Sequence, residues 1–253
     1  MLTPTEWHQR FKFQVRWTQQ LRRFLLTEAI PQMPSRALEV GCGTGAVIND
    51  FHQSGILPTH VHLVGLDIRF DFLQLAQKQK VTLACANAYS LPFPDATFDL
   101  VYCHYLLLWL KYPLPALMEM HRVTRSGGWV IAMAEPDYAH RIDYPPVLSE
   151  LGKLQRQSLI QQGANPDIGA MLAGLFIQAG FQNIKTGLLG GEWDIPQDEE
   201  TWRAEWRVLE ADLQELVSKE KLQEYRKQDA SAWKSGERIL FVPTFYAIGQ
   251  IPC

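Results

Sequence analysis

The stretch Ala37–Gly45, with the sequence ALEVGCGTG, decides the fold of this chain. Residues 37–40 are small, apolar or β-branched apart from one acid, Glu39, and they predict a strand. Three glycines follow at every second position, and a helix-like run, AVINDFHQSG, comes next. Glycines let a ligand approach the backbone closely, and a helix N-terminus offers free N–H groups. The stretch therefore predicts a strand, a loop and a helix that together bind a nucleotide-like ligand.

The composition bounds the class of protein. The chain has 253 residues, 47% of them hydrophobic and 20% charged, which is enough for one large domain with a core. The net charge of −3 and the pI of about 6.2 argue against nucleic acid or an anionic membrane as partner. The four cysteines form no CxxC pair, which suits a reducing, cytoplasmic location and predicts no metal site. The first ten residues do not resemble a signal peptide, and no apolar run is as long as a membrane span.

Strand and helix patterns alternate through the first half of the chain. Apolar runs predict strands at residues 37–40, 62–66, 81–85, 98–103 and 129–133, with helices after Gly45 and at residues 70–78 and 113–124. Repeated β-α units predict a parallel sheet covered on both faces, that is, a doubly wound α/β fold. Ligands of such sheets bind beyond the carboxyl ends of the strands.

The N-terminal residues predict a helical segment that ends near Pro31. Thr3 can cap its first turn, Pro4 suits the first helical position, and Glu6 can close a capping box. Trp7, Phe11 and Val15 then share one face, since they are spaced four residues apart.

The second half is less regular. The pattern predicts helices at residues 147–162 and from Asn165 to Gly180, and a strand at residues 183–193. An apolar stripe at 4-3-4-3 spacing predicts a further helix: Trp202, Trp206, Leu209, Leu213 and Leu216. Residues 239–249 predict a last strand, in which Pro243 favours an edge position or a bulge.

The glycine loop alone leaves the nucleotide open. The run G-C-G-T-G-A satisfies the dinucleotide fingerprint with Ala46 in the last place, so an NAD-dependent oxidoreductase is one alternative. Glu39, however, stands two residues before the first glycine. A carboxylate there repels a pyrophosphate and attracts an ammonium or sulfonium group.

Four motifs occur in order along the chain. They are the acid-plus-glycines run at residues 39–45, the acid Asp67 in HLVGLDIR, the run ANAYSLPFPDATFDLVYC at residues 86–103, and MHRVTRSGGWVIAMAEP at residues 120–136. Together they resemble the class I S-adenosylmethionine-dependent methyltransferases. The most similar group is the small-molecule one, methyltransferase type 11, which includes quinone C-methyltransferases.

The resemblance implies a fold and an activity. The fold is a mostly parallel seven-stranded sheet of the Rossmann-like methyltransferase type, whose last strand lies antiparallel between its neighbours. Residues 1–253 would form one domain, with the N-terminal helical segment 1–33 and a helical insertion 194–236 as lid elements. The activity is in-line transfer of a methyl group from S-adenosylmethionine to an unidentified small-molecule acceptor, with S-adenosylhomocysteine as product. A non-catalytic adenosylmethionine-binding protein is a second alternative, and the oligomeric state stays open.

The resemblance also implies roles for residues at the cofactor site. Asp67 can accept hydrogen bonds from both ribose hydroxyls, and Glu39 lies near the charged methionine tail. Ile68 contacts the adenine or, alternatively, is a core residue at a helix start. Asn87 replaces an Asp that is usual in the family, and its carbonyl can accept from the adenine amino group. The complete set of predicted cofactor-binding residues is Glu39, Gly41, Cys42, Gly43, Gly45, Asp67, Ile68, Asn87, Ala88, Tyr89, Cys103 and His104. Of these, Cys42 is expected to be a small filler with a useful backbone N–H, and Ala88 and Tyr89 to offer N–H groups.

Catalytic candidates follow the fourth and fifth strands. His104 is predicted to contact cofactor or substrate and to act as a general base; its alternative is a pocket-wall or helix-capping histidine. Glu135, Asp137 and His140 either orient a substrate hydroxyl or amine or are solvated loop charges. Five tryptophans either form an aromatic ceiling over a flat acceptor or pack the core: Trp7, Trp17, Trp193, Trp202 and Trp206.

Overall fold

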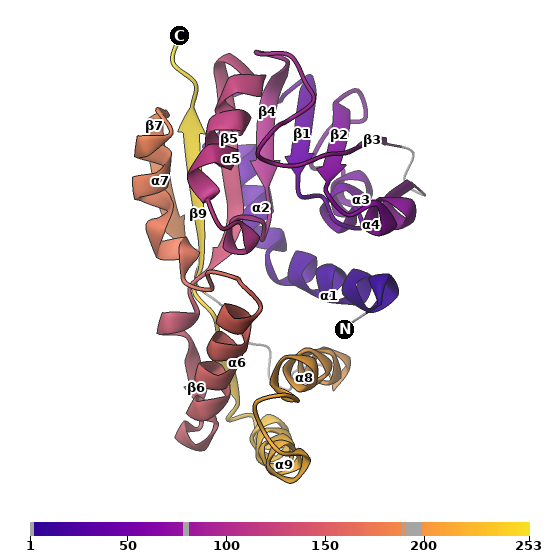
Figure 1. Cartoon of the computed structure of the whole chain (residues 1–253), viewed down its shortest axis with the longest axis vertical. Coiled ribbons are helices and arrows are strands. Elements are labelled where there is room, and N and C mark those ends of the chain that lie inside the picture. The colour runs from indigo at the N-terminus through magenta and orange to yellow at the C-terminus, as the bar shows by residue number, and fades with distance from the viewer. Residues whose placement is uncertain (1–2, 78–80, 189, 191–198) are drawn as a thin grey trace.

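The computed structural model describes residues 3–77, 81–188, 190 and 199–253. Its main element is a seven-stranded sheet of order β3-β2-β1-β4-β5-β9-β7 (Figure 1). The strands are β1 Arg36–Val40, β2 His62–Asp67, β3 Thr82–Cys85, β4 Phe98–Cys103, β5 Thr124–Pro136, β7 Gln182–Leu188 and β9 Thr244–Gln250. Strands β1 to β5 pair in parallel, and β9 is antiparallel to both β5 and β7. The predicted doubly wound sheet, with its last strand antiparallel between its neighbours, is confirmed.

Strand β1 lies at the point where the strand order reverses. It pairs with β2 on one side and with β4 on the other, so the chain runs outward in both directions from it. In open α/β sheets a crevice forms at such a point, beyond the carboxyl ends of the strands. The glycine loop that follows Val40 lies at this crevice.

Helices cover both faces of the sheet. One apolar cluster joins the strands to α5 and α7, and a second joins them to α2, the π-helix Leu25–Ala29 and α3. The bounds of the sheet helices are α2 Gln19–Phe24, α3 Ala46–Ser54, α4 Phe70–Ala76, α5 Pro113–Val123 and α7 Leu172–Gln178. The first helix, α1 Pro4–Trp17, begins with the predicted capping box: the Thr3 hydroxyl accepts from the Glu6 amide, and the Glu6 carboxylate accepts from the Thr3 amide.

A second layer lies beyond the lower end of the sheet in Figure 1. It contains α6 Ser149–Gln161, α8 Glu199–Leu213, α9 Lys219–Ser235 and a two-stranded sheet of β6 Ile142–Tyr144 and β8 Ile239–Phe241. Helix α1 contacts α3 on one side and α8 on the other, so it lies between the main sheet and this layer.

The prediction of one last strand at residues 239–249 is wrong in its continuity. The chain forms β8, breaks at Val242 and Pro243, and then forms β9 in the other sheet. Proline has no N–H to donate to a ladder, so the chain changes sheets there instead of bulging within one. The Pro243 carbonyl accepts from the Asp137 amide at 2.8 Å, which holds the break in place.

Other boundaries differ by a few residues. The helix expected from Asn165 begins as a 3-10 turn at Ile168–Met171 and continues as α7, because Asn165 uses its side chain in a local turn to the Asp167 amide. The fifth strand begins at Thr124, directly after α5. The strand expected at residues 183–193 is β7; of its predicted end, residues 189 and 191–193 lie outside the described part of the chain.

The stripe on α8 packs against α6 and α9. Trp206, Leu209 and Leu213 are buried in a cluster with Leu148 and Tyr225, which confirms the packing alternative for this stripe. Leu216 lies beyond the end of the helix.

The described residues contain no membrane-spanning helix, no metal-binding cluster and no disulfide. No helix among them is long and apolar enough to cross a membrane. Over the same residues, no group of three or more His, Cys, Asp or Glu side chains could hold a metal ion. All four cysteines are free thiols.

Candidate functional site

A cavity of about 1400 Å³ lies at the carboxyl ends of β1, β2 and β4. Its walls come from the glycine loop and the neighbouring motif segments on one side, and from α1, α6 and α8 on the other. Small-molecule sites usually occupy about 300–1,000 Å³. The cavity therefore has room for two ligands side by side.

The glycine loop needs its glycines. Gly41, Gly43 and Gly45 all have positive φ, at +74°, +53° and +75°. A Cβ atom on Gly41 would lie 2.7 Å from Leu106, and one on Gly43 would lie 2.9 Å from Phe11. A side chain at Gly41 or Gly43 is therefore disfavoured both by the backbone conformation and by a clash with a neighbouring side chain.

The N–H groups of the loop are mostly used within the protein. Those of Gly41 and Cys42 donate to the Leu66 carbonyl of β2, at 2.7 and 2.9 Å. The expectation that the Cys42 N–H serves a ligand is corrected, because that donor ties the loop to the sheet. The first turn of α3 offers donors in its place: Ala46 and Val47 line the cavity, and first-turn N–H groups have no partner within a helix.

Asp67 is hydrogen-bonded to the glycine loop and also lines the cavity. One carboxylate oxygen accepts from the Gly43 amide at 2.7 Å, and the other accepts from the Arg69 amide at 2.8 Å. Burial raises the pKa of Asp67, and these two amide bonds oppose the rise. Each oxygen keeps a second lone pair for a ligand hydroxyl.

Glu39 lies at the end of β1 and is only 2% exposed. The Tyr102 hydroxyl donates to it at 3.3 Å. Burial raises the pKa of Glu39 to about 8, against the opposing effects of Tyr102 and of the Arg22 guanidinium. This carboxyl group is therefore mostly protonated near pH 7 until a cation is placed beside it.

The segment after β3 differs from expectation in its donors. The Asn87 side-chain oxygen accepts from the Tyr89 amide at 3.0 Å, so the Tyr89 N–H is not offered to a ligand and the free donor of Asn87 is its NH₂ group. Asn87, Ala88 and Tyr89 all line the cavity. Ile68 lines it too and is 65% exposed, which excludes the alternative of a core residue at a helix start.

Two predicted residues lie away from the cavity wall. Cys103 is the last residue of β4 and is fully buried in the core. Gly45 caps α3, and its N–H donates to the Cys42 carbonyl at 2.8 Å. The remaining ten predicted cofactor residues line the cavity: Glu39, Gly41, Cys42, Gly43, Asp67, Ile68, Asn87, Ala88, Tyr89 and His104. Burial raises the pKa of the Cys42 thiol well above its usual range, so a nucleophilic role is disfavoured.

His104 is held by the N-terminal helices. Its Nε2 atom lies 2.8 Å from the Thr18 hydroxyl, which donates its single proton to the Gln14 carbonyl at 2.8 Å. That hydroxyl also accepts from Arg22 at 2.5 Å, and Arg22 pairs with Asp50 at 2.6 Å. The Thr18 oxygen must therefore accept from Nε2–H, which leaves Nδ1 as the ring nitrogen with a lone pair. Burial and the nearby Arg22 charge lower the pKa of His104 well below its usual value, so the ring is neutral.

Glu135, near the end of β5, has a different role from either alternative. Glu135 is fully buried, and its carboxylate accepts from the amides of Leu106, Leu107 and Leu108 at 3.0, 2.9 and 3.1 Å. It shapes the loop that follows His104 instead of orienting a substrate. Burial raises the pKa of Glu135 to about 7, and the three amide bonds oppose that rise.

Asp137 is likewise structural. It is buried, and it accepts from the Ala139 amide at 3.1 Å and from His140 at 2.7 Å. The His140 side chain is mostly exposed. The predicted substrate role for this pair is thus corrected to a local cap.

The prediction of an aromatic ceiling is wrong for most of the tryptophans that it named. Trp7 lines the cavity, but Trp17 is 52% exposed and lies outside it. Trp202 and Trp206 both donate to one carboxylate oxygen of Asp229, at 2.5 and 2.7 Å, and so point toward α9. Trp193 lies outside the described residues.

Helix α1 covers the glycine loop. Trp7 and Phe11 form a ring cluster with Phe72, with centroid distances from 5.5 to 6.5 Å. His8 contacts the Thr44 hydroxyl at 2.7 Å. The apolar face of α1 was visible in the sequence, whereas its contact with the loop was not.

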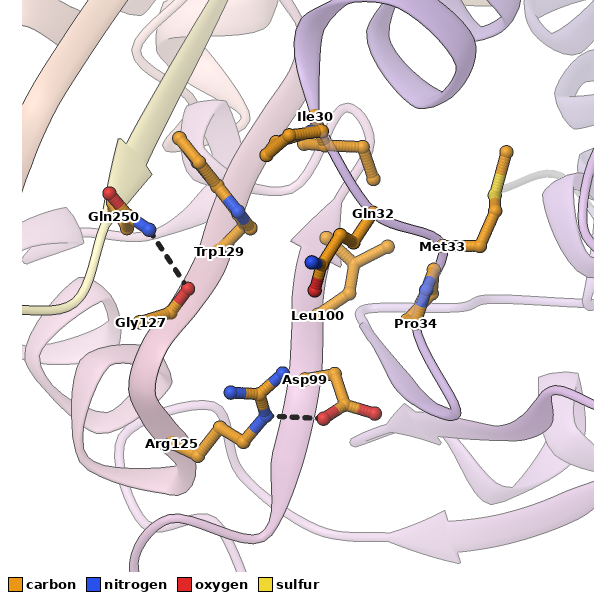
Figure 2. A pocket seen from close by; sticks show the side chains of 11 residues that line it. Ile30, Gln32, Met33, Pro34, Asp99, Leu100, Arg125, Gly127, Trp129 and Gln250 are labelled. Carbon is orange, nitrogen blue, oxygen red and sulfur yellow. Dashed lines mark hydrogen bonds and ion pairs between the residues drawn. The ribbon is translucent and has the colours of Figure 1, made fainter.

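A second, smaller pocket lies at the opposite ends of the parallel strands (Figure 2). Arg125 pairs with Asp99 there, and Asp99 also accepts from the amides of Ser35 and Arg36. Gln250 donates to the Gly127 carbonyl. These groups satisfy one another, so the pocket is a junction between strands and the connecting loops.

Sequence reasoning missed much of the far wall of the cavity. Arg10, Gln14, Tyr138, Ser158 and Asp212 line it, and they come from widely separated segments. The one available signal was a charged residue, Arg10, three positions after Trp7 on the same face of α1.

Comparisons with known proteins match this geometry. A family described as "Methyltransferase domain" matches residues 38–132. An uncharacterized methyltransferase of Schizosaccharomyces pombe is 32% identical over 234 residues, which cover 85% of this chain and 83% of that protein. A demethylmenaquinone methyltransferase of Lysinibacillus sphaericus is 32% identical over 172 residues, which cover 59% of this chain and 71% of the relative.

A solved structure shares the fold. The phosphoethanolamine N-methyltransferase 2 of Haemonchus contortus, in complex with phosphomonomethylethanolamine and S-adenosylhomocysteine, superposes with a TM-score of 0.59 at 15% identity. The match covers 96% of this chain and 57% of that one. The likeness in sequence to the fission yeast protein, over most of both chains, decides between the methyltransferase and the NAD-dependent alternative. The chain belongs to the class I S-adenosylmethionine-dependent methyltransferases and is an enzyme of that family.

Proposed function

We propose that this enzyme methylates a small molecule that shares the cavity with the cofactor. The size of the cavity carries the proposal, since about 1400 Å³ exceeds what one small ligand needs. The net charge of −3 gives no support to a nucleic-acid acceptor. The names of the bacterial relatives, demethylmenaquinone methyltransferases, support quinone-like acceptors as the first class to test.

The side of the cavity formed by the glycine loop, Asp67, Ile68 and Asn87 carries groups that fit adenosylmethionine. Asp67 has two lone pairs left for the ribose hydroxyls, and Glu39 supplies a buried carboxyl group for the cationic methionine tail. Ile68 offers an exposed apolar surface for the adenine, and the Asn87 amide donates to a ring nitrogen. Gly41, Gly43 and Gly45 shape the loop, and the first turn of α3 adds N–H donors.

His104 is the proton acceptor in this proposal, although its lowered pKa makes it a weak base. When bound, the cofactor supplies a methyl group activated by its sulfonium. Nδ1 of His104 would take up the proton that the acceptor loses as the methyl group leaves the sulfonium sulfur for the acceptor atom, with neutral S-adenosylhomocysteine as the leaving group, and Thr18 keeps the ring oriented through Nε2. Alignment of two reactants can lower a barrier by roughly 7–11 kcal/mol, so the effect of His104 on the rate is expected to be modest beside that of the cavity.

The segments 1–33 and 194–236 are proposed to act as covers of this single domain through their described parts, residues 3–33 and 199–236; residues 1–2 and 194–198 lie outside the described residues. α1 contributes Trp7 and Phe11 to the wall over the glycine loop, and α8 contributes Asp212. Such covers exclude water and seat the acceptor.

Two measurements test the proposal. Thermal shift with S-adenosylhomocysteine should raise the melting temperature, and NAD should not. Transfer of a radiolabelled methyl group to quinols, phenols and other small acceptors should then find a substrate. Labelling of RNA or protein alone would contradict the small-molecule assignment, whereas stabilisation by NAD would contradict the cofactor site.

A further inference from the structure

The wall of the cavity that faces α8 carries two polar donors without a protein acceptor. Arg10, on α1, is only 9% exposed and lines the cavity. Its nearest carboxylate is that of Asp212 on α8, at 3.7 Å, which is an ion pair but is too long for a hydrogen bond. Its guanidinium also lies 5.0 Å from the centroid of the Trp7 ring. Within the described part of the chain no oxygen accepts a hydrogen bond from any of its five N–H groups.

Tyr138 is the second donor. Its ring packs against the main core, its hydroxyl group has no hydrogen-bond partner among the described residues, and the side chain lines the cavity. Burial raises the pKa of this hydroxyl, so it stays protonated and able to donate. Arg10, Tyr138 and Asp212 line the same cavity.

Asp212 is fixed from behind by α6. Gln155 donates to one of its carboxylate oxygens at 2.8 Å, and Gln162 approaches the other at 3.5 Å. The Ser158 hydroxyl donates to its backbone carbonyl at 2.5 Å. These contacts hold the Asp212 carboxylate opposite Arg10.

The Arg10 guanidinium and the Tyr138 hydroxyl line the cavity and have no protein acceptor among the described residues, so their N–H and O–H groups are available to a ligand. Arranged around a cavity, they are suited to an oxygen supplied by a ligand. The walls beside them are apolar, formed by Leu108, Trp109 and Leu159. The ligand that fits is thus a largely apolar body with an acceptor oxygen at one end.

We propose that Arg10, Tyr138 and Asp212 form the anchoring subsite for the methyl acceptor, and that it binds a carbonyl or carboxylate oxygen on an apolar, ring-sized molecule. Arg10 and Tyr138 donate to that oxygen. Asp212 balances the charge of Arg10 and accepts from a neighbouring hydroxyl when the ligand has one. This inference rests on the proposed function, because it assigns the part of the cavity that the cofactor leaves open.

The test is calorimetric binding of three naphthalene probes to the protein saturated with S-adenosylhomocysteine. The probes are 2-naphthoate, 2-acetonaphthone and 2-naphthylmethylammonium. The first two should bind, and the ammonium probe should bind at least about tenfold more weakly. Arg10→Met, which keeps the stem over Trp7, should weaken 2-naphthoate at least about tenfold, the scale of one charge-assisted hydrogen bond. Tyr138→Phe should weaken both oxygen probes by a smaller factor.

Controls separate the subsite from the fold and from the cofactor. Arg16→Met lies on the exposed side of the same helix and should leave all affinities unchanged. The double variant Arg10→Met with Asp212→Asn removes both charges and should show the same loss for 2-naphthoate without an unpaired carboxylate.

Four outcomes would overturn the inference. They are equal affinity of Arg10→Met and wild type for 2-naphthoate, preference for the ammonium probe, binding of none of the probes, and an equal loss of S-adenosylhomocysteine affinity in Arg10→Met. The last result would assign Arg10 to the tail of the cofactor. In each of these cases S-adenosylhomocysteine still binds the wild type, so the proposed function stands; its own failure would appear as no binding of S-adenosylhomocysteine at all.

Discussion

The hydroxyl of Thr18 lies 2.8 Å from Nε2 of His104, although 86 residues separate them in the chain. A threonine on the N-terminal helical segment thus selects the tautomer of the histidine that follows the fourth strand. The same hydroxyl accepts from Arg22, whose charge disfavours a protonated ring. The properties of His104 are therefore set by residues outside the four sequence motifs.

Thr18→Val should remove the preference of His104 for the tautomer with a proton on Nε2. The variant leaves the Nε2–H of His104 and one Arg22 donor unsatisfied, so unfolding free energy should fall by about 1–3 kcal/mol in urea titrations. Ring ¹⁵N shifts of His104 should report Nε2–H in the wild type and a mixture of tautomers in the variant. Thr18→Ser keeps the hydroxyl and serves as the control. A wild-type ring protonated at Nδ1 would contradict the assignment.

Asp67→Ala should weaken S-adenosylhomocysteine at least about tenfold, because charge-assisted bonds to the ribose hydroxyls are lost. Calorimetry gives the dissociation constant. Asp71→Ala removes an exposed acid that pairs with Arg69 in the same segment, and it should leave the constant within about twofold. The ribose assignment fails if the two variants behave alike.

Glu39 should release a proton when S-adenosylhomocysteine binds. Its pKa of about 8 leaves it mostly protonated at pH 7, and a neighbouring ammonium group lowers that pKa. Calorimetry at pH 7 in buffers of different ionisation enthalpy should show release approaching one proton, and affinity should rise from pH 6 to pH 8. Glu39→Gln should abolish both effects. Proton uptake on binding would refute this role.

The same raised pKa predicts a trend in stability. The folded state holds the Glu39 proton up to about pH 8, whereas the unfolded chain loses it near the ordinary carboxyl value of about 4.5. The stability that the Glu39 proton contributes is fully present below the unfolded pKa of about 4.5. It is lost as the pH rises through the folded pKa of about 8. Unfolding free energy should therefore decline by up to about 1.4 kcal/mol per pH unit from this group between these values, and Glu39→Gln should flatten the curve.

Gly43→Ala and Gly55→Ala form a matched pair. Both glycines have positive φ, at +53° and +64°, so each alanine carries a backbone strain of about 1 kcal/mol. Only at Gly43 does the new methyl group meet a neighbour, Phe11 at 2.9 Å, while nothing lies within 4 Å of it at Gly55. Thermal melts should show a larger loss for Gly43→Ala, and Phe11→Leu should reduce the difference between the two variants. Equal losses would mean that α1 does not rest on the loop.

The sequence predicted the part of the protein that depends on local pattern. Alternating apolar runs located β1 to β5, and the capping signals located α1 and its first turn. Pro243 predicts an edge position or a bulge within one strand, because nothing local indicates that residues 239–241 pair with Ile142–Tyr144 instead of continuing in the main sheet. Periodicity identifies a strand, but it does not choose the partner of that strand.

The site was predictable to the same extent. Glu39 and Asp67 were found because both stand beside the glycine loop in sequence or at a strand end. Glu135 was misassigned, since its three amide partners at Leu106–Leu108 belong to another loop. Arg10 and Asp212 meet only through packing of α1 against α8, and no spacing in the sequence encodes that contact.

The position of α1 between the sheet and α8 has a consequence for the order of assembly. Asp212 is synthesised roughly two hundred residues after its partner Arg10, a delay of tens of seconds at typical elongation rates. Until then the sheet can pair its first five strands, whereas the cavity lacks the wall that α8 contributes. The nascent chain therefore completes its glycine loop long before it completes the cavity.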